Sequence, residues 1–88
     1  MKIKDGFVVN NVGGRIIAVA TGTASKDFHG MITLNETAKF LWDKLMIGSS
    51  EEEIMKAVVH EFSVSEEKAG ADVHCFINKL RNAGILNE

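Results

Sequence analysis

Residues 30–45, GMITLNETAKFLWDKL, predict a short strand that runs directly into a helix. Met31–Leu34, with Ile and Thr at its centre, favours a strand, and a helical period begins after Asn35. Asn35 is typical of an N-cap, because its side-chain oxygen can accept a hydrogen bond from an unpaired amide of the first turn. The apolar residues that follow share one stripe at helical spacing: Ala38, Leu41, Trp42, Leu45 and Met46. The strand and the helices after it must therefore share one core.

A β-hairpin is predicted before this stretch. Phe7–Val12 and Arg15–Thr21 are rich in Val and Ile, and Gly13-Gly14 between them can take the positive φ angles of a two-residue turn. One face would hold Phe7, Val9, Ile16, Ala18 and Ala20, and the other Val8, Asn10, Val12, Arg15, Ile17 and Val19. Neither face is purely polar. The second face is either partly exposed, which is favoured since isolated surface apolar residues are common, or covered by a second chain.

Residues 21–30 lack a sustained period and predict a loop that returns the chain to the third strand. Phe28 is expected to pin this loop to the body of the protein. His29 is interpreted as a solvated loop histidine, because only Asp27 near it could share a metal.

Two further helices are predicted after the first, which spans about Glu36–Ile47. Ser49 with Glu52 and Ser50 with Glu53 both have capping-box spacing at the start of the second helix. Its buried stripe is Ile54, Ala57, Val58 and Phe62. The third helix is predicted over residues 66–82. The sequence therefore predicts an α+β fold, with an N-terminal three-stranded antiparallel sheet followed by three helices, in the order βββααα.

The third helix has a distinct core face and two polar edges. Ser65 is its expected N-cap, and Gly84 lies beyond its end. The core face comprises Ala69, Val73, Phe76, Ile77 and Leu80; Asp72 and Lys79 flank one edge, His74 and Arg81 flank the other, and Cys75, Asn78 and Asn82 lie opposite. The apolar tail Ile85-Leu86 is expected to fold back onto the core.

The composition limits the kinds of protein that this chain can be. Residues 1–88, of which 45% are hydrophobic, are expected to form a single domain with one core. The formal charge is −2, and residues 51–88 hold eight acids against four bases, which argues against nucleic-acid binding. One cysteine excludes an intramolecular disulfide, and no signal peptide or long apolar run occurs. A cytoplasmic protein without membrane contact is expected, with monomer and homodimer both open.

Catalysis and metal binding are not expected. Asp72, His74 and Cys75 are the only local collection of reactive side chains, and their helical directions lie roughly 100 to 200° apart. They cannot converge on one reacting atom. His60 and His74 lie on different helices without a third ligand between them. Cys75 is either a spare surface cysteine or a residue covered by a partner.

Four stretches together resemble a known family: GMITLNETAKFLWDKL, the acidic helix start Glu51–Ile54, the run Asp72–Leu80 and the ending Gly84–Leu86. They resemble the PqqD-like family, the pyrroloquinoline-quinone biosynthesis D proteins and their relatives. The resemblance covers nearly the whole chain. It implies a winged-helix-like domain, also called a RiPP recognition element, that holds the leader segment of a ribosomally made precursor peptide for a modifying enzyme. Such domains are not themselves catalysts. A radical S-adenosylmethionine enzyme is the implied partner, and its cofactor would belong to that partner.

The resemblance also implies a site. In this family the leader peptide lies between the third strand and the third helix, which corresponds here to Met31, Ile32, Thr33, Asp72, Val73, Phe76, Lys79 and Leu80. An edge strand can pair with an extended peptide, which agrees with this placement. Any small domain must also close its core, so a pure core role is the favoured interpretation of Val73, Phe76 and Leu80. Asp72 and Lys79 are the candidates for charge selection, and which edge of the helix lines the groove stays open.

A helix-turn-helix regulator that binds DNA is the alternative. Residues 51–82 have its outline of helix, short turn and helix. However, Glu66 and Glu67 occupy the first turn of the would-be recognition helix, where phosphates would approach, and little chain follows Leu86 to build a wing. Peptide binding is therefore the preferred function.

Overall fold

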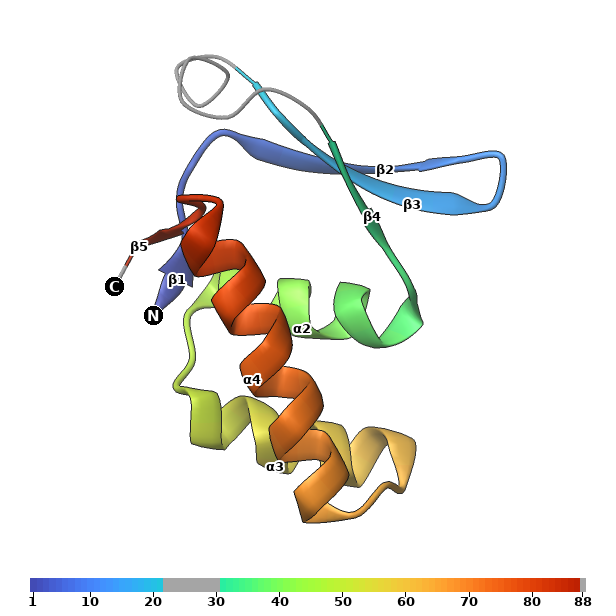
Figure 1. Cartoon of the computed structure of the whole chain (residues 1–88). Helices are drawn as coiled ribbons and strands as arrows, with labels where there is room; N and C mark the ends of the chain where they lie inside the picture. The colour runs from blue at the N-terminus through green and yellow to red at the C-terminus, as the bar shows by residue number, and fades with distance from the viewer. Residues whose placement is uncertain (22–30, 88) are drawn as a thin grey trace.

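A computed structural model of the chain describes residues 1–21 and 31–87. The elements in chain order are β1 (Lys2–Ile3), β2 (Phe7–Val12), β3 (Arg15–Ala20), β4 (Met31–Leu34), α2 (Glu36–Ile47), α3 (Glu51–Phe62), α4 (Glu66–Asn82) and β5 (Leu86–Asn87). Figure 1 shows the β2–β3–β4 sheet at one end, α2 beneath it, and α3 and α4 crossing at the other end. The predicted three-stranded sheet followed by three helices is confirmed. The expectations for Phe28 and His29 lie outside the described residues.

The sheet has the predicted hairpin and register. Gly13 and Gly14 take φ angles of 58° and 83°, which only glycine adopts at low cost in consecutive positions. This turn pairs Val8 with Val19 and Val12 with Arg15, and β3 pairs in turn with β4. The antiparallel order β2-β3-β4 leaves β4 at one edge of the sheet.

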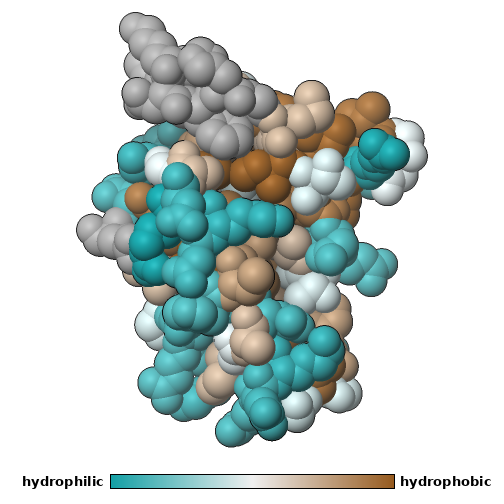
Figure 2. All heavy atoms as spheres, viewed as in Figure 1, coloured by the Kyte–Doolittle hydropathy of each residue, from teal (hydrophilic) through white to brown (hydrophobic). Residues whose placement is uncertain are grey.

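The two faces of the sheet differ in exposure. Phe7, Ala18 and Leu34 are buried on the inner face, against the helices. On the outer face Val8, Val12 and Met31 are 43%, 59% and 63% exposed. Figure 2 shows apolar side chains gathered at the sheet end and polar ones around the helical end. In the single chain this outer face is therefore partly exposed.

One core joins the sheet to all three helices. Its largest fully buried side chains include Trp42, Leu45, Ile77 and Leu80. Met46, which was expected on the buried stripe of α2, is 39% exposed, so that expectation is wrong. At 100° per residue Met46 lies at the margin of the stripe centred on Leu41, Trp42 and Leu45, which are the buried residues of α2.

The helix caps are local and follow the sequence closely. Asn35 Oδ1 accepts a hydrogen bond from the Ala38 amide at 2.8 Å, as predicted. Ser50 and Glu53 form a complete capping box at the start of α3. The second predicted box is wrong, because the Ser49 hydroxyl instead donates to the Lys44 carbonyl at 3.3 Å and closes the end of α2.

A small second sheet, which was not predicted, ties the termini together. β1 and β5 pair antiparallel, with Ile3 opposite Leu86, and both side chains are buried. The Lys4 amide donates to the Ile85 carbonyl at 2.8 Å, and the Ser49 amide donates to the Met1 carbonyl at 3.1 Å. This sheet holds the C-terminal end of α4 in place. No helix in the described ranges is both long and apolar enough to span a membrane.

Acid should weaken the start of α3 through Glu53. Hydrogen bonds from the backbone and then the side chain of Ser50 hold the pKa of Glu53 below its ordinary value of 4.5. Because the pKa is lower in the folded state, the box stabilises the protein fully above about pH 4.5 and less as pH falls through the folded pKa. Melting temperatures measured between about pH 5 and about pH 3 should show a smaller acid loss in Glu53→Gln, which caps without titrating. Equal losses in both proteins would contradict this role.

Candidate functional site

A hollow of about 460 Å³ lies between the edge strand β4 and the helix α4. Ile32 and Thr33 border it on one side, the first two turns of α2 close one end, and α4 forms the opposite wall. The strand-to-helix join at Asn35, itself a lining residue, sets the angle between β4 and α2. The same local sequence that decides the fold therefore shapes the hollow.

The β4 edge borders the hollow directly. Ile32 and Thr33 are adjacent and point to opposite faces of the sheet, yet both line the hollow. Within residues 1–21 and 31–87, no further strand pairs with β4 on the side away from β3. In an antiparallel edge strand, alternate residues direct their amides and carbonyls away from the sheet. Hydrogen-bonding groups are thus available where the hollow opens.

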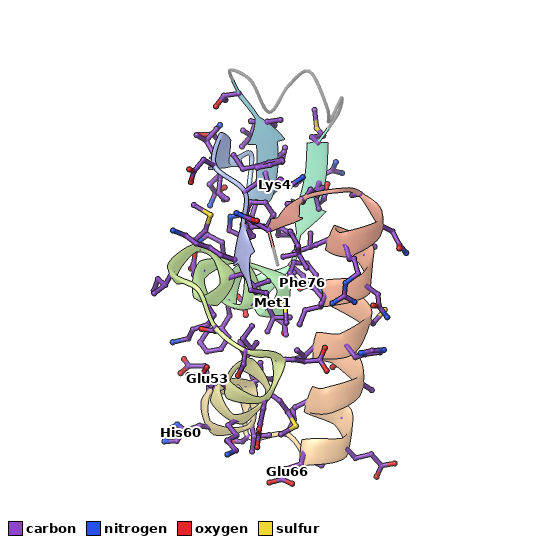
Figure 3. The ribbon with its side chains drawn as sticks, turned by 90° about the vertical axis from the view of Figure 1, so that its left-hand side faces the viewer. Met1, Lys4, Glu53, His60, Glu66 and Phe76 are labelled. Carbon is purple, nitrogen blue, oxygen red and sulfur yellow. The ribbon has the colours of Figure 1, made fainter. Side chains whose placement is uncertain are left out.

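The floor of the hollow is apolar. Leu41 and Val58 are buried, and Phe62, Val64 and Phe76 are half-buried. Phe62 is held edge-on against Phe40, with ring centroids 5.3 Å apart. In Figure 3 the Phe76 side chain extends from α4 toward the side of the molecule that holds β4 and α2. An apolar side chain that entered between strand and helix would contact this floor.

The α4 wall carries a line of polar side chains. Lys68, Asp72, Cys75 and Lys79 line the hollow at spacings of four, three and four residues, which align along one side of a helix. Lys68 Nζ lies 3.4 Å from Asp72 Oδ2. The edge of α4 that faces the hollow is therefore the one bearing Asp72 and Lys79.

The opposite edge of α4 is engaged elsewhere. His74 Nδ1 lies 3.5 Å from Glu51 Oε1, Asn78 contacts His74, and Arg81 donates to Asn78 at 2.7 Å. These exposed contacts join α4 to the start of α3. His74 thus points away from Asp72 and Cys75, and the described residues hold no cluster of three His, Cys, Asp or Glu that suits a metal.

The eight residues expected at the site occupy three different positions. Five of them line the hollow: Ile32, Thr33, Asp72, Phe76 and Lys79. Val73 and Leu80 are fully buried behind the α4 wall and do not line it. Met31 lies on the outer face of the sheet, 63% exposed.

Several lining residues were not identified from sequence. Cys75 was expected opposite the core face and about 100° or more from Asp72, and that prediction is wrong, because residues three apart lie only about 60° apart around a helix. Cys75 therefore lines the hollow on the same side of α4 as Asp72 and Lys79. Continuing this stripe by four residues towards the start of α4 would also have found Lys68. Phe62 and Val64 had no such signal. They reach the hollow because α3 and α4 cross beneath α2, which is a tertiary feature (Figure 1).

Comparison with known proteins agrees with the family resemblance seen in the sequence. The family model for coenzyme PQQ synthesis protein D (PqqD) matches residues 8–86. No curated protein sequence matches the chain. Among solved structures, TbiB1 in complex with the TbiA(beta) leader peptide is similar, with 25% identity, a TM-score of 0.76, and coverage of 99% of this chain and 95% of that one.

A second similar structure is lasso peptide synthetase B1 complexed with the leader peptide. It is 16% identical, has a TM-score of 0.74, and aligns over 99% of this chain and 96% of that one. At this identity the likeness shows the fold alone.

Proposed function

The chain belongs to the PqqD family, and from this premise we propose that it captures the leader segment of a ribosomally made precursor peptide and presents it to a modifying enzyme. The observation that carries the proposal is the hollow, which opens along the edge strand β4 and has an apolar floor. TbiB1, which is similar over nearly its whole length, is described in complex with a leader peptide.

The leader is proposed to bind as an added antiparallel strand along Met31, Ile32 and Thr33. Hydrogen bonds between backbones supply affinity that does not depend on the leader sequence. Because side chains alternate along a strand, every second leader residue enters the hollow toward Phe76 and Phe62. Val73 and Leu80 act behind this wall, since their buried side chains hold α4 and Phe76 in place.

The domain is proposed to bind and position the peptide, not to catalyse a reaction. Residues 1–88 would act as one peptide-binding domain in the cytoplasm, and the chemistry would belong to a partner, a radical S-adenosylmethionine enzyme. Glu66 and Glu67 lie in the first turn of α4, where a DNA-reading helix would approach phosphates. Their negative charges would repel those phosphates, so peptide capture is preferred over the DNA-binding alternative.

Titration of isotope-labelled protein with a candidate leader, taken from a short precursor gene beside its own, tests the proposal. Amide shifts should concentrate on β4, on the start of α2 and on α4 from Lys68 to Lys79, because these segments surround the hollow. The hairpin tip at Gly13 and Gly14 serves as an internal control and should not shift. Shifts confined to that tip, or none with peptide at about millimolar concentration, would contradict the proposal.

A further inference from the structure

The charged side chains around the hollow are not balanced. Among the described residues, those lining it are two lysines, Lys68 and Lys79, and one aspartate, Asp72. The Lys68 and Asp72 side chains pair at 3.4 Å and are 64% and 48% exposed. Lys79 forms no ion pair with any residue in the described ranges. One ammonium group at the mouth of the hollow therefore has no carboxylate partner.

The positive charge at the hollow is opposite in sign to the net charge of the whole protein. The formal charge of the chain is −2, and the nearby helix α3 begins with three consecutive glutamates. A peptide that approaches the hollow meets Lys79 beside an apolar floor, and the Lys68–Asp72 pair beyond it. Charge complementarity favours an anionic group at Lys79 and an apolar group beside it.

The dimensions of the hollow limit how far apart these groups can lie. From Lys68 to Lys79 the α4 wall is about 16 Å long at 1.5 Å per residue. An extended peptide covers that length with about five residues. The anionic and apolar side chains must therefore come from one short segment, in which alternate residues face the hollow.

Resting on the proposed function, we infer that the hollow selects leader segments in which an aspartate or glutamate lies within a few residues of a large apolar residue. Lys79 binds the leader carboxylate, and the floor around Phe62 and Phe76 takes the apolar side chain. Asp72 weakens this preference for acidic segments, because its carboxylate neutralises the charge of Lys68. Removing Asp72 should strengthen the binding of acidic peptides.

Selection from a displayed library of random peptides on the full chain tests the inference. Peptides enriched on the unmodified protein should combine an acidic and a large apolar residue, and selection on Lys79→Glu should shift the charged position to Lys or Arg. Against one enriched peptide, Lys79→Glu should weaken binding roughly threefold to tenfold, and Asp72→Asn should tighten it about twofold. The Lys79→Glu effect should shrink as ionic strength rises from about 0.1 M to about 1 M, where the Debye length falls to about 3 Å.

Lys56→Glu is the matched control. Lys56 is 69% exposed on α3, pairs with Glu52 and does not line the hollow, so the same change in net charge should leave binding within about twofold. Enrichment of apolar peptides without charge preference, or equal losses in Lys79→Glu and Lys56→Glu, would overturn the inference and leave peptide capture standing. Failure of the folded, unmodified protein to enrich any peptide would overturn the proposed function itself.

Discussion

Replacement of Trp42 by alanine should cost about 3 to 5 kcal/mol of unfolding free energy, the largest loss expected from a single change in α2. The Trp42 side chain is 1% exposed and lies at the centre of the core. Its ring packs edge-on against Phe7, with centroids 5.9 Å apart and planes 76° apart. Because Phe7 belongs to β2, this contact joins the helical layer to the sheet.

The loss should be visible in urea unfolding followed by circular dichroism. A domain of this size has roughly 4 to 13 kcal/mol of stability in total, so Trp42→Ala would remove a large share of it, and nearly all of it at the low end of that range. Trp42→Phe, which keeps an aromatic ring beside Phe7, should lose less than half as much. A loss below about 1 kcal/mol for the alanine variant would show that the stripe of α2 does not carry the core.

The parts of the fold that follow from sequence are those decided by neighbouring residues. Asn35 caps α2, Ser50 and Glu53 cap α3, and Gly13-Gly14 sets the hairpin register, because each acts within four residues of itself. Strand and helix bounds followed from these signals.

Features decided by contacts between distant residues could not be predicted from the sequence. β1 and β5 are two residues each, too short for a period, and they exist because Ile3 and Leu86 meet across the whole chain. Ser49 has the same capping spacing as Ser50, but the end of α2 captures its hydroxyl. Local patterns cannot decide between two such partners.

The predictions for the candidate site also depended on whether local sequence was enough. The helical wheel of α4 placed Asp72 and Lys79 on one edge, and the structure then identified that edge as the one facing the hollow. Val73 and Leu80 could not be separated from Phe76 by periodicity, because all three lie on the apolar face of α4. Burial separates them, since Phe76 reaches the hollow and the other two do not.

Filling the hollow should abolish most peptide binding while the protein stays folded. Ala38 is half-buried on the first turns of α2 and lines the hollow. Its backbone amide makes the capping bond to Asn35, which a change of side chain leaves intact. The large side chain of Ala38→Trp would occupy the space proposed for an apolar leader residue above Phe62 and Phe76.

The expected loss for Ala38→Trp is about 1.5 to 3 kcal/mol of binding free energy, the value of burying one large apolar side chain. This corresponds to roughly a tenfold to hundredfold rise in Kd, measured by fluorescence anisotropy with a peptide enriched on the unmodified protein. Ala38→Leu, with a smaller side chain, should lose less. Ala71→Trp is the control, because Ala71 is exposed on α4 outside the hollow and the same side chain there should leave binding unchanged. Unaltered affinity in a folded Ala38→Trp protein would mean that a peptide pairs with the β4 edge without entering the hollow. Selectivity would then have to come from the outer face of the sheet, where Met31 is exposed.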